Sequence, residues 1–154
     1  FTGGTLIVLF NIAYLIISIW ILVGIKFGIW NPDILYSIVT ITFTFASLYS
    51  LIILIGILTQ SSIFAMMLSY LIFFVLSPIL TARDTISAFL DSPVLEIFLD
   101  IFYYIIPKTS ELGTLTTELA IGYGIDEYQP ILTTLAFLLL VLYTSIIIFN
   151  KKDY

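Results

Sequence analysis

The sequence contains no cysteine and no histidine, and only 10% of its 154 residues are charged. The absence of thiols excludes disulfides and thiolate ligands, and the absence of imidazoles removes the commonest metal ligand and proton carrier. A soluble domain carries about 25% charged residues, so this chain has too little charge to cover a water-facing surface. We therefore expect no soluble globular domain.

Basic residues are also scarce, because the chain has five Lys and Arg against ten Asp and Glu and a formal net charge of -5. Phosphate recognition needs clustered Lys or Arg, so we expect no nucleic-acid partner. The sequence also lacks a phosphate-binding loop, an HExxH helix and a GxSxG turn. We expect no catalytic residue, cofactor or metal in the chain, and no enzyme activity of its own.

Hydrophobic residues make up 61% of the chain and occur in long runs, with no charge in residues 1–25, 34–82 and 130–150. Crossing the hydrocarbon core of a bilayer takes roughly 20 apolar residues in a helix, and the strands of membrane barrels alternate instead. We predict an all-α, polytopic membrane helix bundle with four transmembrane helices, at residues 5–23, 34–58, 63–80 and 131–149. They form a single transmembrane domain. Because the first residue is not Met, we expect the chain to be part of a longer protein.

Polar residues recur at helical spacing within the first two spans, which places each set on one helix face. In the first span we expect that face to look toward the other helices. These polar stripes, one on each span, could line a translocation path, or their side chains could hydrogen-bond between packed helices. Packing is the commoner role in membrane bundles. The two sets are Asn11, Tyr14 and Ser18 in the first span and Ser37, Thr40, Thr44 and Ser47 in the second.

Two short connections separate the first three spans. Trp30 and Pro32 favour an interfacial turn between spans one and two. The uncharged break at Thr59, Gln60, Ser61 and Ser62 predicts a tight turn that makes spans two and three antiparallel neighbours. Near the end of the third span, Pro78 predicts a kink or a sharp exit.

Residues 83–129 form an outer segment with two basic and eight acidic residues. Within it, Pro93 starts a predicted helix that ends before Pro107. At about 20 Å this helix is too short to cross the membrane, so we expect it at the interface or as a re-entrant dip. A second helix is predicted from Thr109 or Ser110 to a turn at Gly122 and Gly124. Glu96 and Asp100 lie four residues apart on one face. Together with Asp91 they could hold a metal or act as paired acids, but solvated charges are a better interpretation.

Lys151 and Lys152 after the last span favour a cytoplasmic carboxyl terminus. Counting back across four spans places the amino end and the turn at 59–62 on the cytoplasmic side. The turn at 26–33 and the segment at 83–129 then lie outside.

Two apolar helices joined by a short turn, a long outer segment with short helices, a final span and the ending FNKKDY resemble the carboxyl-terminal part of type-2 ATP-binding-cassette (ABC) transporter permeases. Residues 103–112, YYIIPKTSEL, look like the outer helical hairpin of bacterial members. The resemblance implies the last four of six spans, a prokaryotic cell (inner) membrane, a homo- or heterodimer of permeases and a separate ATP-binding subunit. It also implies that residues 59–62 face that subunit and that residues 93–107 form a re-entrant cap.

Two other functions compete with this expectation. A structural or assembly subunit of another multi-pass membrane complex would use the hydroxyl stripes only for packing. A membrane enzyme would need the outer acids, Glu96 and Asp100, to be essential.

Overall fold

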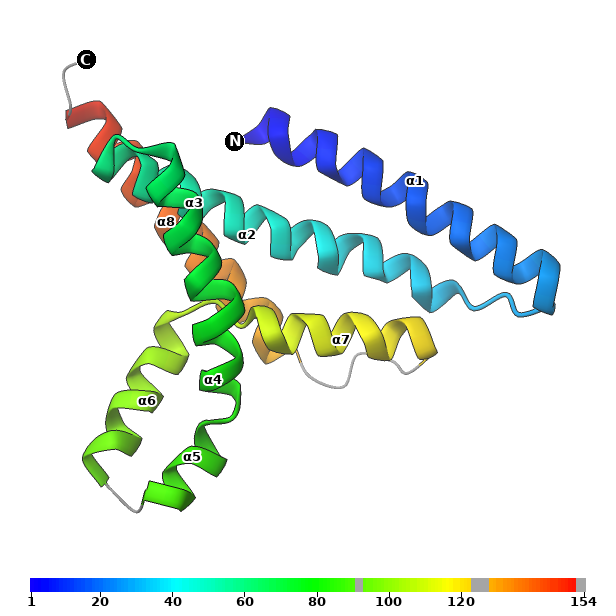
Figure 1. Cartoon of the computed structure of the whole chain (residues 1–154). Coiled ribbons are helices and arrows are strands. Elements are labelled where there is room, and N and C mark those ends of the chain that lie inside the picture. Colours follow the sequence, from blue (N-terminus) through cyan, green and yellow to red (C-terminus); the bar gives the residue numbers. More distant parts are fainter. Residues whose placement is uncertain (91–92, 123–127, 152–154) are drawn as a thin grey trace.

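The computed structural model of the chain describes residues 1–90, 93–122 and 128–151, and these are almost entirely helical (Figure 1). Glu96 has a described backbone, but its side chain lies outside the described part, as do Gly124 and the tail after Lys151. The elements are α1 (Thr2–Phe27), α2 (Tyr36–Thr59), α3 (Ser62–Leu71), a π-helical segment (Ile72–Leu76), α4 (Ser77–Thr81), α5 (Arg83–Leu90), α6 (Pro93–Ile105), α7 (Thr109–Ile121) and α8 (Gln129–Lys151).

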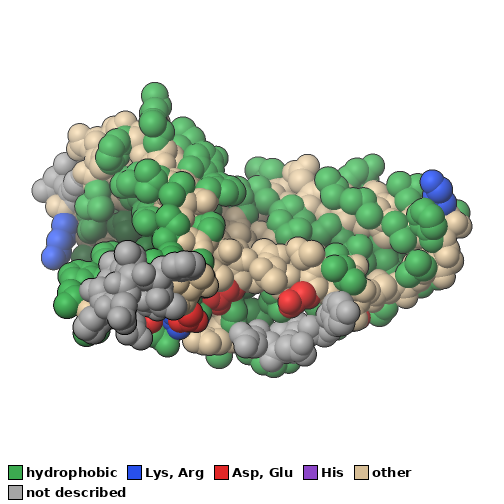
Figure 2. Space-filling view, turned by 60° about the horizontal axis from the view of Figure 1, so that its bottom comes forward, with side chains coloured by type: hydrophobic (Ala, Val, Ile, Leu, Met, Phe, Trp, Pro, Cys, Tyr) green, Lys and Arg blue, Asp and Glu red, His purple; other side chains and the backbone are tan. Residues whose placement is uncertain are grey.

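Four helices are long and apolar enough to cross a membrane: Thr2–Phe27, Pro32–Thr59, Ser62–Thr81 and Gln129–Lys151. They coincide with the four predicted spans and each extends a few residues beyond its predicted limits. Figure 2 shows hydrophobic side chains over most of the visible face, with acidic side chains gathered in one strip. The prediction of an all-α membrane helix bundle is confirmed.

The second span lies at the centre of the fold, because α1, α3, α7 and α8 all pack against α2. Toward its end, Leu51 and Ile55 form a core with Ala65 and Phe73 of the third span. Toward its start, Phe43 packs on a second core of three leucines from α7, namely Leu112, Leu115 and Leu119. In Figure 1, α1 runs beside α2 at the outer edge of the molecule. The first span is therefore the least buried of the four.

The predicted turn between the second and third spans is present. Gln60 ends α2 in the left-handed conformation, at φ 54°, and the Ser61 side chain accepts a hydrogen bond from the backbone N–H of Phe64. Phe1, Ile57 and Phe149 line one cleft, so the amino end, this turn and the end of α8 lie on the same side of the bundle (Figure 1). This relative placement agrees with the predicted topology.

The turn between the first two spans is held by aromatic packing. Gly28 ends α1 at φ 69°, and the chain then places the Trp30 ring against Gly24 and at 5.0 Å from the Trp20 ring. A Cβ atom on Gly24 would lie within 2.8 Å of the Trp30 ring, so only glycine fits there. The Asn31 side chain accepts from the N–H of Asp33 and caps the short 3-10 turn at Pro32–Leu35 that leads into α2.

The hydrogen bonding of the third span changes at the turn before its proline. Pro78 has no N–H, and its ring would clash with the carbonyl of residue 74 in a regular helix. The preceding turn widens into the π-helical segment Ile72–Leu76, in which the Ser77 N–H bonds to Ile72 O. The proline therefore distorts the helix as a π-helical turn that begins one turn before it, within a span that stays helical from Ser62 to Thr81.

The outer segment is more helical than the sequence indicated. The helix predicted from Pro93 is observed as α6, and the second helix begins at Thr109 and ends at Gly122, with φ 98°. Residues 83–90 were expected to be loop but form α5. That helix begins directly after the third span, so α5 and α6 lie together beyond α4 (Figure 1).

Candidate functional site

Residues 107–109, the end of the connection between α6 and α7 with the first residue of α7, pack against the third span. Pro107, Lys108 and Thr109 are all buried. The Ser77 hydroxyl donates to Pro107 O at 3.4 Å and accepts from the Ser110 N–H at 3.2 Å. We call residues 107–109 the tip. It packs beside the last two turns of the third span, and whether this segment is re-entrant or interfacial stays a prediction.

The π-helical turn in the third span leaves one backbone carbonyl, Phe73 O, free to accept a hydrogen bond from the tip. In the widened turn the Ser77 N–H bonds to Ile72 O, and Pro78 has no N–H to offer to Phe73 O. Thr109 donates its hydroxyl to Phe73 O at 3.4 Å instead. A buried backbone carbonyl is costly without a donor, particularly within a membrane, so the tip and the break stabilise each other.

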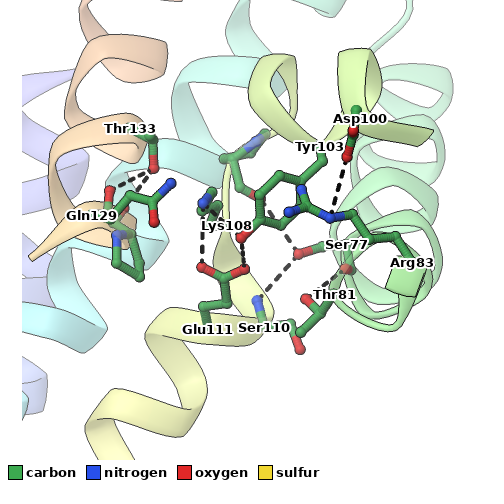
Figure 3. A network of polar contacts seen from close by, with 12 residues as sticks. Ser77, Thr81, Arg83, Asp100, Tyr103, Lys108, Ser110, Glu111, Gln129 and Thr133 are labelled. Atoms are coloured by element: carbon green, nitrogen blue, oxygen red, sulfur yellow. Dashed lines mark hydrogen bonds and ion pairs between the residues drawn. The ribbon is translucent and has the colours of Figure 1, made fainter. Parts of the chain in front are cut away.

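Five side chains around the tip form a polar cluster, which we call the Tyr103 network: Arg83, Asp100, Tyr103, Lys108 and Glu111 (Figure 3). Tyr103 donates its hydroxyl proton to Glu111 Oε1 at 2.6 Å, and Lys108 Nζ donates to Tyr103 Oη at 2.7 Å. Lys108 Nζ also lies 3.6 Å from Glu111 Oε2. The Lys108 side chain is only 2% exposed, so these partners replace its hydration.

Tyr103 lies between two cations. Arg83 Cζ is 3.6 Å from the centre of the Tyr103 ring, and Lys108 Nζ is 3.9 Å from it. Arg83 Nε lies 3.3 Å from Asp100 Oδ1 and 3.4 Å from Asp84 Oδ1. Helices α5, α6 and α7 are thus joined through one aromatic ring.

The surroundings fix the protonation of the network. Burial and the hydrogen bond to Glu111 raise the pKa of Tyr103 well above its usual range, so the phenol keeps its proton. Burial by itself lowers the pKa of Arg83, but Tyr103 and the carboxylates of Asp84 and Asp100 raise that pKa overall. Arg83 therefore remains a cation in contact with the neutral phenol.

The network holds the tip in place and is not a ligand pocket. The cavity lined by Ser77, Tyr103, Lys108 and Glu111 has a volume of about 10 Å³, room for roughly one water molecule. No group of three acidic side chains comes together as a metal site anywhere in the described part of the chain.

The three outer residues singled out from the sequence have different environments. Asp100 is half-exposed and pairs with Arg83, so it is not fully solvated. Pro107 is buried at the tip. Glu96 lies on α6, and its side chain is outside the described residues, as is the whole of Asp91.

The stripe on the second span packs against α7 over its first half. Ser37 and Thr40 are buried, and the Thr40 and Thr116 hydroxyls are 2.8 Å apart. Ser37 Oγ lies 3.5 Å from Thr116 O. Ser47 is fully buried and its hydroxyl has no hydrogen-bond partner among the described residues.

Thr44, the remaining member of that stripe, differs from its neighbours. Its hydroxyl donates to Thr40 O at 2.9 Å, and the side chain lines a cleft of about 320 Å³. The cleft lies between the second span, the broken part of the third span and α7. Its other lining residues are Ile41, Phe45, Leu48, Phe73, Phe74, Gly113 and Thr116.

The stripe on the first span points away from the other helices, so the expectation that it looks toward them is wrong. Tyr14 is 78% exposed and Asn11 is also exposed, whereas Ile16 on the opposite face is buried. Asn11 Nδ2 donates to Ile7 O and Ser18 Oγ donates to Tyr14 O, both within α1. The spacing predicted one face correctly but could not tell which way it turns.

The turn at residues 59–62 presents an exposed polar surface on the side of the bundle that holds the amino end. Thr59, Gln60 and Ser62 are exposed and Ser61 is half-buried. Thr59 donates its hydroxyl to Ile55 O at 2.8 Å. Contact of this turn with an ATP-binding subunit stays a prediction.

Sequence reasoning missed the Tyr103 network. Lys108 and Glu111 were counted among the charges of an outer loop, and no spacing linked them to Arg83 or Tyr103. One local signal was available, because Lys108 and Glu111 are three residues apart at a helix start and follow a proline.

Comparison with known protein families, with curated proteins and with solved structures finds no match to this chain.

Proposed function

We propose that the chain is a membrane-spanning permease subunit of an ABC-type transporter, in which a separate subunit hydrolyses ATP and this subunit moves the substrate. The observation that carries the proposal is the inserted tip beside a π-helical break in the third span. Membrane proteins place irregular backbone at membrane depth only where protein or a cavity surrounds it, and π-helical turns within helices are frequent at functional sites. Here the break and the tip form one buried unit next to a cleft.

The cleft that contains Thr44 is the proposed place of substrate contact. Its walls are mainly aromatic and aliphatic, and they come from three elements: the second span, the π-helical part of the third span and α7. Its volume of about 320 Å³ is in the range of small-molecule sites. The substrate on this proposal has an apolar portion that the cleft covers.

The turn at residues 59–62 is the proposed contact with the ATP-binding subunit. It lies on the same side as the amino end and the end of α8, away from the tip. On this proposal that side is cytoplasmic, in a prokaryotic cell membrane, and the functional assembly pairs two permeases. This placement supports an arrangement in which one side of the bundle binds the ATP-binding subunit and the other side carries the re-entrant cap.

Reconstitution with the ATP-binding protein encoded beside the gene tests this proposal. We expect a complex whose ATP hydrolysis changes when the chain is present. Ser62→Arg, an exposed position in the turn, should lower recovery of the complex on the order of tenfold, which corresponds to about 1.4 kcal/mol. The matched control is Tyr128→Arg, exposed at the start of α8 on the other side, which should bind normally. No complex with the unmodified chain rejects the proposal.

An assembly subunit of another membrane complex is the second candidate, and the contact between Thr40 and Thr116 favours it because that part of the stripe only packs. Thr44→Ala separates the two. The permease proposal expects a changed substrate profile with normal assembly, since Thr44 lines the cleft. An assembly role expects Thr40→Ala and Thr44→Ala to weaken assembly without altering any substrate profile.

A membrane enzyme has weaker support, because Asp100 is bound to Arg83. If Glu96→Gln and Asp100→Asn leave every activity of the assembled protein intact, an enzyme that depends on these acids is ruled out.

A further inference from the structure

One wall of the cleft that contains Thr44 is helix backbone without a side chain. Gly113 lies within α7 and lines this cleft, and a Cβ atom at that position would meet no atom within 4 Å. The glycines with a positive φ in the described part of the chain are Gly28 and Gly122, so the backbone at Gly113 does not require glycine. Glycine is the least favourable residue in a helix after proline. Neither the helix nor its packing within this chain therefore explains Gly113.

Two other helix glycines of this chain show what a bare stretch of backbone receives. The Tyr49 ring packs on Gly4 and the Trp30 ring packs on Gly24, each so close that a Cβ atom would meet the ring at 2.9 Å or less. In both places the glycine makes room for an aromatic ring from elsewhere in the chain. Gly113 leaves similar room on the wall of the cleft, and no atom of the described chain fills it.

The polar groups of the cleft are already used within the protein. Thr44 donates its hydroxyl to Thr40 O at 2.9 Å, and Thr116 donates to Leu112 O at 2.7 Å. No charged side chain is present among the described residues that line the cleft. An anion would find no free hydroxyl proton there and a cation would find no carboxylate, so a charged group would lose its hydration without compensation.

The position of the cleft also favours an uncharged occupant. Of the two phenylalanines in its wall, Phe73 is buried and Phe74 is 72% exposed, so the cleft opens beside Phe74. Both lie near the middle of the third span, Ser62–Thr81. That depth corresponds to the hydrocarbon of a bilayer rather than to water. A group that is already dissolved in lipid reaches the cleft without being dehydrated.

We propose that Gly113 sets the size of the group that the cleft admits, and that this group is an uncharged apolar ring that enters from the lipid. The ring lies against the bare backbone of α7, as the Tyr49 and Trp30 rings lie against Gly4 and Gly24. This inference rests on the proposed function, because it takes the cleft as the place of substrate contact. It adds the chemical class of the substrate and the residue that selects for size.

Photolabelling of the full-length protein in phospholipid vesicles tests the proposal. The probe is benzophenone, an uncharged aromatic ketone that on irradiation reacts with nearby C–H bonds. Mass spectrometry of peptides compares label in residues 41–48 of the cleft with label at Leu139 and Leu140, which are exposed on α8 and sample the probe dissolved in lipid. We expect the cleft label to saturate and the α8 label to rise in proportion to the probe. A cleft label that is absent or does not saturate overturns the proposal, because another part of the protein or ordinary lipid then fills the cleft.

Substitutions at residue 113 test the size selection. Gly113→Leu should lower the saturable label on the order of tenfold, and Gly113→Ala should lower it less. The matched control is Thr114→Leu, the exposed neighbour outside the cleft lining, which should label normally. Because a Cβ atom at residue 113 meets no atom, neither Gly113 variant should unfold at a lower temperature than the unmodified protein. Unchanged labelling of Gly113→Leu, or a lower Tm for Gly113→Ala, overturns the role of Gly113.

A charged probe tests the substrate class. The carboxylate derivative, para-benzoylbenzoate, should label the cleft at least about tenfold less than benzophenone when each is compared with its own label at Leu139 and Leu140. Equal relative labelling overturns the uncharged class. Binding of the probe needs neither ATP nor a partner subunit. Saturable labelling without an ATP-dependent complex therefore rejects the permease and keeps the site, whereas a complex without saturable labelling rejects this inference alone.

Discussion

Polar side chains have opposite environments in the first span and at the tip. Along α1, in a stretch without charge, the polar side chains of Asn11 and Tyr14 point outward. At the tip, in the segment richest in charge, the Lys108 side chain is buried against Tyr103 and Glu111. Hydropathy therefore tells which segments enter the membrane, but burial within the protein depends on which partners each polar side chain finds.

The tip and the first span are also stabilised by different kinds of interaction. The tip is held by hydrogen bonds and ion pairs that join α5, α6, α7 and the third span. The first span is held by one apolar face and by the Trp30 turn. Disturbing the first kind should cost more, because a buried charge that loses its partner retains its desolvation penalty.

The largest effect is expected from Glu111→Gln. This change removes the charge that neutralises Lys108 and should lower the free energy of unfolding by about 3 kcal/mol. The measurement is thermal or denaturant unfolding of the full chain in mild detergent. Glu118→Gln, the same change seven residues along α7, is the control and should have little effect. If both variants unfold alike, the ion pair at the tip does not contribute to stability.

A double variant tests whether the loss of stability comes from leaving Lys108 without its partner. Lys108→Met with Glu111→Gln removes both charges together, so it should be more stable than Glu111→Gln alone. Further loss of stability in the double variant would show that Lys108 does not depend on Glu111.

A smaller effect is expected from Gly24→Ala in the first span. The new Cβ atom would lie within 2.8 Å of the Trp30 ring, so the turn must shift. We expect a loss of about 1–2 kcal/mol, after allowing for the better helix propensity of alanine. Gly3→Ala, with no atom within 4 Å, is the control and should not destabilise. Trp fluorescence during unfolding reports the effect, and an unchanged midpoint for Gly24→Ala contradicts it.

The smallest effect is expected from Thr40→Val, which keeps the shape of the side chain. It removes the hydrogen bond to Thr116, whose hydroxyl still bonds to Leu112 O. The expected loss is about 1 kcal/mol. Thr144→Val, whose hydroxyl bonds only within α8 at an exposed position, is the comparison and should change less. Equal effects would mean that the stripe on the second span adds nothing to the packing of α7.

These contrasts show which parts of the structure the sequence could predict. The spans follow from the length of uncharged runs, and Pro93, Pro107 and Gly122 mark the ends of α6 and α7 because proline and glycine restrict the backbone locally. The distortion of the helix near Pro78 follows from the missing N–H. All of these depend on residues close together in the chain.

The parts that the sequence could not predict depend on distant residues. The ammonium group of Lys108 is buried against Tyr103 and Glu111, and Ser77 bonds to the neighbouring Pro107 O. Helix α5 packs against α6. The direction of the Asn11 face is set by which side of α1 meets α2, and periodicity alone does not contain that choice. The same spacing on the second span turned inward at Thr40.

Crosslinking between the tip and the third span tests the central claim, that the tip packs against the π-helical part of that span. Ser77→Cys combined with Ser110→Cys should be joined within one chain by a short thiol crosslinker in intact membranes, because the Ser77 hydroxyl contacts the Ser110 N–H. The pair Ser77→Cys and Thr117→Cys, two turns further along α7, should not be joined. Efficient joining of the second pair, or none of the first, would contradict an inserted tip.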